Sequence, residues 1–105
     1  MATNLNFIQG KKIEIKTILL QSMKSQFDVL IDAVVDNVCF TLNFRNVSNL
    51  SFHELFAPLE IYGFEYHDNK QKGWDKSIRY SIRDFEDDKL RFDCESIDCI
   101  VNQKH

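Results

Sequence analysis

Apolar residues alternate with polar ones on both sides of a short acidic segment in the last third of the chain. In residues 78–83, and again in residues 90–94, every second position is apolar, and residues 84–88 between them read DFEDD. A period of two is typical of a strand with one buried face, so this pattern predicts an antiparallel hairpin. The residues expected to share its buried face are Tyr80, Ile82, Leu90 and Phe92.

The same alternation predicts strands in the first half of the chain, at residues 13–20 and 38–44. Residues 27–35 fit two templates, because their apolar residues recur at the helical spacing as well as at every second position. Three aspartates on one parity, opposite a fully apolar parity rich in β-branched residues, favour a strand. A helix stays open as the alternative for residues 17–35. Residues 36–37, Asp-Asn, are expected to form a turn.

Two slips of the alternation interrupt the pattern later in the chain. In residues 59–66 the apolar parity changes at Gly63, and we expect a β-bulge there, because a bulge adds one residue and glycine tolerates its unusual dihedrals. A second slip predicts a bulge or bend at residues 95–96. Ser51, with a glutamate three residues later, matches the capping box of a single helical turn before Pro58.

These elements predict one β-rich domain over residues 1–105. A chain of this length holds one core, and 44% hydrophobic residues with nine Phe can fill it. About six strands joined by short turns predict an all-β fold, an antiparallel β-sandwich or a strongly curved sheet, with at most one or two short helical turns.

The N-terminal residues lack the basic start and apolar core of a signal peptide, and no apolar run is long enough to cross a membrane. Cys39, Cys94 and Cys99 are odd in number and lie in apolar strand-like contexts, so we expect reduced thiols instead of disulfides. A cytoplasmic protein without membrane contact is the resulting expectation.

Candidate chemistry is sparse in this sequence. His53, His67, Cys94 and Cys99 do not have the spacing of a zinc site, and residues 84–88 lack the central glycine and terminal glutamate of a calcium loop. Neither histidine accompanies a nucleophile elbow or a glycine-rich anion cradle. We therefore expect no catalytic, cofactor or metal site, and no enzyme activity.

The charges point to a protein partner. A net charge of −3, from 13 basic and 16 acidic residues, argues against nucleic-acid binding. Seven acids gather between residues 84 and 98, which indicates either a docking face for a basic partner or a solvated hairpin surface. The aromatic residue at position 74 stands in a polar loop, where it can cover the core or anchor a partner. The residues expected to bind the partner are Trp74, Asp84, Glu86, Asp87 and Asp88.

Residues 63–66 (GFEY), 72–74 (KGW), 79–84 (RYSIRD) and 92–97 (FDCESI) resemble small, poorly characterised proteins of low-GC Gram-positive bacteria, some of which look like immunity proteins encoded beside toxins. The resemblance implies stoichiometric binding in the cytoplasm and carries over no catalytic residue. The resulting hypothesis is a small non-enzymatic protein-binding module, in its narrower form an immunity protein that occludes a toxin domain. The alternative is a structural or self-associating domain with no dedicated ligand. The sequence does not fix the oligomeric state.

Overall fold

The computed structural model describes residue 5 and residues 8–53, 59–69, 79–86 and 88–104. This part of the chain contains strands and turns but no helix. The strands are β1 (Ile13–Met23), β2 (Gln26–Val35), β3 (Val38–Arg45), β4 (Ser48–Phe52), β5 (Glu60–Ile61), β6 (Phe64–Asp68), β7 (Tyr80–Asp84), β8 (Leu90–Cys94) and β9 (Ser96–Lys104).

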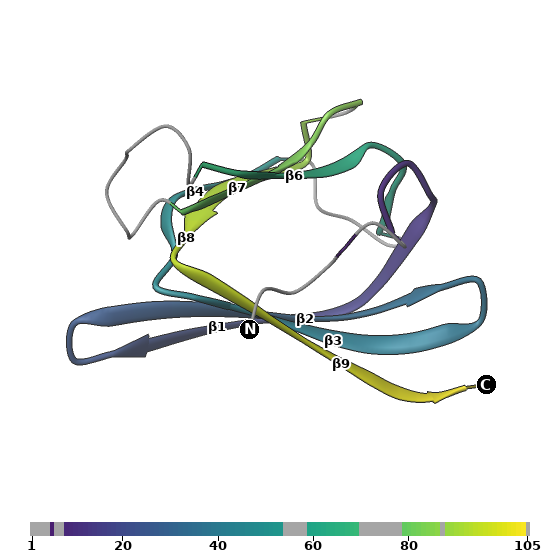
Figure 1. Cartoon of the computed structure of the whole chain (residues 1–105), viewed down its shortest axis with the longest axis horizontal. Coiled ribbons are helices and arrows are strands. Elements are labelled where there is room, and N and C mark those ends of the chain that lie inside the picture. The colour runs from purple at the N-terminus through teal and green to yellow at the C-terminus, as the bar shows by residue number, and fades with distance from the viewer. Residues whose placement is uncertain (1–4, 6–7, 54–58, 70–78, 87, 105) are drawn as a thin grey trace.

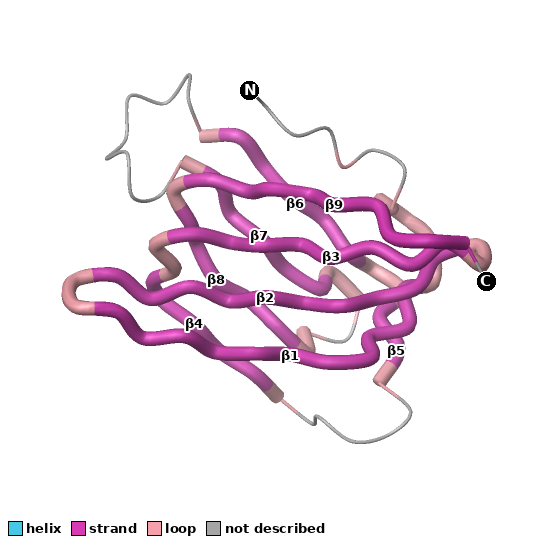
Figure 2. The backbone as a smooth tube through the Cα atoms, turned by 90° about the horizontal axis from the view of Figure 1, so that it is seen from below, coloured by secondary structure: helices cyan, strands magenta, loops and turns pink. Residues whose placement is uncertain are grey.

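The strands form two antiparallel sheets that pack face to face as a β-sandwich (Figure 1). The larger sheet has the order β5-β1-β2-β3-β9, and the smaller has the order β4-β8-β7-β6. Figure 2 shows the larger sheet in front, with the strands of the smaller sheet crossing behind it at an angle. The expected fold class is therefore confirmed.

The hairpin predicted at the end of the chain is β7–β8. Ile82 lies opposite Phe92, and Tyr80 lies opposite Cys94. The four residues expected on its inner face are all buried, which confirms the predicted parity. The strand interpretation of residues 27–35 is also confirmed, because they lie within β2.

Asp36 and Asn37 join β2 to β3, and both have positive φ, at 52° and 66°. Val35 lies opposite Val38, so only these two residues separate the strands. Two residues with positive φ are the requirement of the type I′ turn, whose twist matches that of the flanking strands. The expected turn is confirmed.

The parity slips mark places where the chain changes sheets. Gly63 follows β5 of the larger sheet and precedes β6 of the smaller one, so the β-bulge expected there is wrong. Glu95 separates β8 from β9 in the same way, which corresponds to the expected bend. After a crossing, the strand lies in the opposite sheet and points its inner side chains at the same core from the other side. The positions that face the core therefore change parity.

Ser51 lies inside β4 opposite Arg91, so its expected role as a helix cap is wrong. The helical turn itself was expected at residues 54–58, which lie outside the described residues. The register of β4 against β8 shifts between Ser48 and Ser51, and Asn49 there has a φ of 56°. The Ser51 hydroxyl lies 2.9 Å from His53 Nε2, whereas the buried Ser48 Oγ has no hydrogen-bond partner among the described residues.

The inner faces of both sheets meet in one apolar core. Phe44 of the larger sheet and Phe92 of the smaller sheet pack edge to face, with ring centroids 4.9 Å apart. This pair joins the two layers of the sandwich. The largest fully buried apolar side chains are Phe40, Phe44, Phe92, Leu5, Ile8, Ile61, Ile82, Leu90 and Val29.

Candidate functional site

The turn between β7 and β8 is organised by a buried carboxylate. Asp84, the last residue of β7, is 1% exposed. Its Oδ1 accepts the N–H of Glu86 at 3.3 Å, and its Oδ2 accepts the N–H of Lys89 at 3.2 Å. The N–H of Asp88 donates to the Asp84 carbonyl oxygen at 3.1 Å. Asp84 therefore fixes the turn from inside. The expectation that it is exposed on an acidic docking face is wrong.

The β5–β6 crossing holds the same turn from the other side. The N–H of Phe85 donates to the carbonyl oxygen of Gly63 at 2.6 Å. A Cβ atom at position 63 would lie 2.5 Å from the backbone nitrogen of Glu86, closer than non-bonded contacts of real Cβ atoms come. Glycine is therefore required because backbone approaches backbone, which the sequence pattern did not indicate.

Phe85 projects from this fixed turn into solvent, with 68% of its surface exposed. Glu86 and Asp88 beside it are also exposed, as expected. Tyr62, next to Gly63 in the crossing, is a second exposed aromatic residue. We call the residues Tyr62, Phe85, Glu86 and Asp88 the turn face. Sequence reasoning missed Phe85, although its position between two acids already indicated that it lies in a turn.

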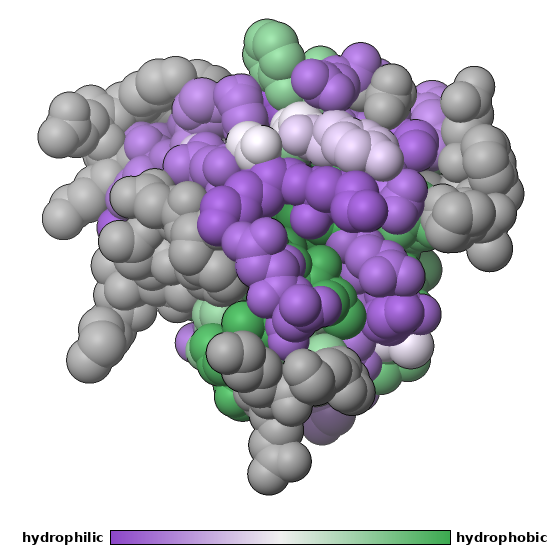
Figure 3. All heavy atoms as spheres, turned by 90° about the vertical axis from the view of Figure 1, so that its right-hand side faces the viewer, coloured by the Kyte–Doolittle hydropathy of each residue, from purple (hydrophilic) through white to green (hydrophobic). Residues whose placement is uncertain are grey.

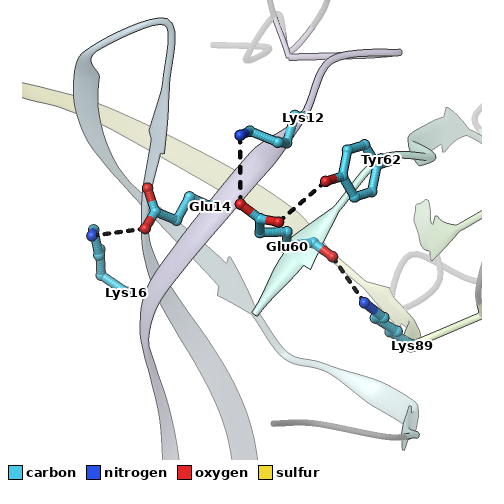
Figure 4. Close-up of polar contacts among 6 residues, drawn as sticks. All are labelled: Lys12, Glu14, Lys16, Glu60, Tyr62 and Lys89. Carbon is cyan, nitrogen blue, oxygen red and sulfur yellow. Dashed lines mark hydrogen bonds and ion pairs between the residues drawn. The ribbon is translucent and has the colours of Figure 1, made fainter. Parts of the chain in front are cut away.

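Tyr62 is held by Glu60 of β5 (Figure 4). Its hydroxyl donates to Glu60 Oε1 at 3.1 Å, and Lys12 Nζ lies 3.5 Å from Glu60 Oε2. Lys89 Nζ donates to the Glu60 carbonyl oxygen at 3.1 Å, which ties the residue before β8 to a strand of the other sheet. These contacts fix the turn and the crossing relative to one another.

Figure 3 shows the end of the sandwich that lies to the right in Figure 1. Among the described residues in this view, hydrophilic ones cover most of the surface, and apolar atoms are visible in the gap between them. Exposed aromatic side chains on such a hydrophilic surface are the kind of feature that protein-binding sites use.

Two arginines lie beside the turn face. Arg83 of β7 lies directly opposite Arg91 of β8, and with Phe85 and Asp88 they line a depression of about 230 Å³. Like charges directly opposite one another cost stability. Neither guanidinium forms an ion pair with the residues that the structure describes. The turn face therefore carries negative charge at Glu86 and Asp88 and has positive charge beside it at Arg83 and Arg91. It differs in this from a purely acidic docking face.

A second depression, of about 330 Å³, lies farther along the outer face of the smaller sheet, and a polar network lines it. Asn69 Nδ2 donates to Ser81 Oγ at 2.8 Å, and Ser81 Oγ donates to Asp93 Oδ1 at 2.9 Å. Asn49 Nδ2 donates to the other carboxylate oxygen of Asp93 at 2.8 Å. The hydroxyl proton of Ser81 is therefore directed to a carboxylate. Nucleophilic catalysis would instead require a histidine base to accept this proton.

Ser51 Oγ and His53 Nε2 are 2.9 Å apart on the exposed surface of the smaller sheet. No carboxylate among the described residues orients the His53 ring. Burial raises the pKa of Cys94 to about 12, with a smaller contribution from Asp93, so its thiol stays protonated. Neither group has the activation that a catalytic nucleophile needs.

Within the described ranges, no three His, Cys, Asp or Glu residues gather as a metal site would require. Across the same ranges, no helix is long and apolar enough to span a membrane. Trp74 and Asp87 lie outside the described residues. Of the five residues expected to bind a partner, the structure therefore places two, Glu86 and Asp88, together on the surface.

The comparisons with known proteins leave the site to be interpreted from its own geometry. No protein-family model, curated protein or solved structure matches this chain.

Proposed function

We propose that this chain is a small non-enzymatic protein-binding module that docks on its partner through the turn face. The observation that carries the proposal is Phe85, a large apolar side chain 68% exposed on a turn that both Asp84 and Gly63 hold in place. In the narrower form of the proposal, the partner is a toxin domain and this chain is the cytoplasmic immunity protein that occludes it.

The rigidity of the turn supports this function. Binding orders side chains and loops at an entropic cost, so an aromatic anchor on a fixed turn binds more tightly than the same anchor on a mobile loop. Aromatic anchors that enter a partner's pocket dominate the energetics of many interfaces. Phe85 has the exposure such an anchor needs, and Tyr62 adds a second aromatic surface on the adjoining segment.

The charges around Phe85 would select the orientation of the partner. Glu86 and Asp88 attract basic groups, whereas Arg83 and Arg91 beside them repel such groups. A partner that fits both signs of charge must place basic residues near the acids of the turn and none near the two arginines. Such mixed charge favours one docking register over others.

The test begins with capture of a partner from the source cell by the wild-type chain, followed by binding kinetics with the purified partner. Phe85→Ala should weaken binding by about 30-fold, because loss of a central aromatic anchor costs about 2 kcal/mol or more. Ile100→Ala is the matched control, since Ile100 is similarly exposed but lies on β9 of the larger sheet and belongs neither to the turn face nor to β1. Equal binding by the Phe85 variant would overturn the proposal.

The immunity form has a separate test. The partner should arrest growth when it is expressed alone, and the wild-type chain should restore growth when both are expressed. Phe85→Ala should fail to restore growth at equal protein level, whereas Ile100→Ala should restore it. A captured partner that is harmless when expressed would remove the immunity form and leave the general binding proposal standing.

A further inference from the structure

One edge of the larger sheet is left without a neighbouring strand over most of its length. β5 pairs with β1 only at Ile13 and Glu14, and the N–H of Ile15 donates to the Leu59 carbonyl oxygen. From Thr17 to Met23, the outer edge of β1 has no strand beside it in the described part of the chain. Figure 2 shows β5 beside the right-hand end of β1 only.

This free segment of β1, residues 17–23, lacks the usual protection of an exposed edge. It contains no charged residue and no proline. Leu19, Leu20 and Met23 are 51%, 46% and 52% exposed, and the alternation of a strand places Leu20 on the face opposite the other two. An unpaired edge that is long, uncharged and apolar is a template for another strand.

The other edges carry more of such protection. β9 carries Asp98, whose carboxylate is 2.7 Å from Arg45 Nε, and β6 has only five residues and carries charged ones. β4 also has five residues, and a register shift interrupts it. Charge, short length and irregular register are the ordinary means by which proteins block edge pairing. The free segment of β1 is therefore the longest uncharged stretch on an edge of this sandwich, since the uncharged stretch of β9, residues 99–103, is shorter although Ile100 and Val101 in it are exposed.

We propose that the free segment of β1 pairs with the same segment of a second copy of this chain, antiparallel about a twofold axis at Leu20. This register uses all seven residues and places Leu20 opposite its own counterpart. It places Thr17 opposite Met23, Ile18 opposite Ser22, and Leu19 opposite Gln21 of the partner. No charged residue falls within it.

The chemistry of the segment favours a second copy as the occupant. An uncharged strand offers no charge by which a different partner could be selected, whereas pairing with its own copy places Leu20 opposite Leu20 and brings no like charges opposite one another. A twofold contact is isologous and closes on itself, so association ends at the dimer. The dimer would join the two larger sheets into one continuous sheet.

Sedimentation equilibrium of the full chain tests the proposal. The wild type should show twice the 12.4 kDa mass of one chain. Leu20→Lys places two like charges on the twofold axis and should raise the dissociation constant by at least about tenfold. Ile100→Lys is the matched control, because Ile100 is 61% exposed on the other edge strand, and it should remain dimeric.

Each other outcome would overturn the proposal: a monomeric wild type, open-ended association, or a dimer that Ile100→Lys disrupts and Leu20→Lys does not. Leu19→Lys, on the opposite face of the strand, is a second variant if Leu20→Lys fails to fold as judged by circular dichroism. Hydrogen exchange provides a measurement without mutation, since the amides of residues 17–23 should gain protection as the wild-type concentration rises. Dimerisation is independent of partner docking, so Phe85→Ala should stay dimeric.

Discussion

Asp84 illustrates how one residue can belong to two patterns. It opens the acidic segment, which suggests exposure, but it also shares the parity of Tyr80 and Ile82, which suggests burial. The structure follows the parity, because the backbone N–H groups of Glu86 and Lys89 satisfy its buried carboxylate. The parity that indicates burial of Asp84 could thus be found in the sequence. The hydrogen-bond donors that make this burial possible depend on how the turn folds.

Phe92 should be among the residues most important for stability. It is buried and joins the two sheets through Phe44, so Phe92→Ala leaves a cavity at the centre of the core. We expect a loss of about 3–5 kcal/mol in the free energy of unfolding, measured by urea denaturation. Phe85→Ala is the control and should change it by less than about 0.5 kcal/mol. A loss under about 1 kcal/mol for Phe92→Ala would contradict its place in the core.

Cys94 should be inert in the folded protein. Burial raises the pKa of its thiol from 9.0 to about 12, so the stabilisation from keeping it neutral is complete below pH 9.0 and is lost as the pH rises toward 12. Iodoacetamide at pH 8, followed by mass spectrometry, should label Cys94 only after denaturation. Cys39 and Cys99 are partly exposed and serve as internal controls. Rapid labelling of Cys94 in the native state would show that it is accessible.

At the scale of the elements, alternation predicted which segments are strands but not which sheet each one joins. A β-bulge and a crossing between sheets both change the apolar parity, so Gly63 and Glu95 gave the same signal in the sequence. The choice between them depends on pairing with distant strands, such as β5 with β1 and β9 with β3. For the same reason, the free edge of β1 could not be predicted before the short length of β5 was known.

Gly63→Ala should disturb both the crossing and the turn. The new Cβ would meet the backbone nitrogen of Glu86, which cannot move without breaking the hydrogen bonds that Asp84 makes in the turn. We expect a loss of about 1–3 kcal/mol in the free energy of unfolding, the usual cost of overpacking. Changed NMR shifts at residues 84–89 would confirm the coupling. Unchanged stability and shifts would mean that the two segments are not in close contact.

At the scale of the whole molecule, folding gives several acids of the acidic segment polar partners. Asp98 pairs with Arg45, Asp93 accepts hydrogen bonds from Asn49 and Ser81, and Glu95 accepts one from Asn46. Glu86 and Asp88, beside Phe85, have no such side-chain partner among the described residues. Most of these contacts could not be predicted from the sequence, because Arg45, Asn46 and Asn49 lie far from the acidic segment along the chain.

The remaining acids of the turn face should act on the rate of association with the proposed basic partner. Exposed charges steer encounter and are screened by salt, so Glu86→Gln with Asp88→Asn should slow association up to about tenfold at low salt and flatten its salt dependence. Dissociation and folding should change little, because neither carboxylate forms an ion pair with the described residues. Asp84 is left intact, since its carboxylate holds the turn and its loss would confound the result.

Glu95→Gln with Asp98→Asn is the matched control, because it removes the same charge from another part of the same segment. If steering depends on the turn face, this control should slow association less than the turn variant does, when both are compared by stopped-flow kinetics across a salt series. Equal slowing by the two variants would assign the effect to net charge alone. An unchanged on-rate in the turn variant at low salt would leave Phe85 to act without electrostatic guidance, and the acids would then serve only to keep the turn hydrated.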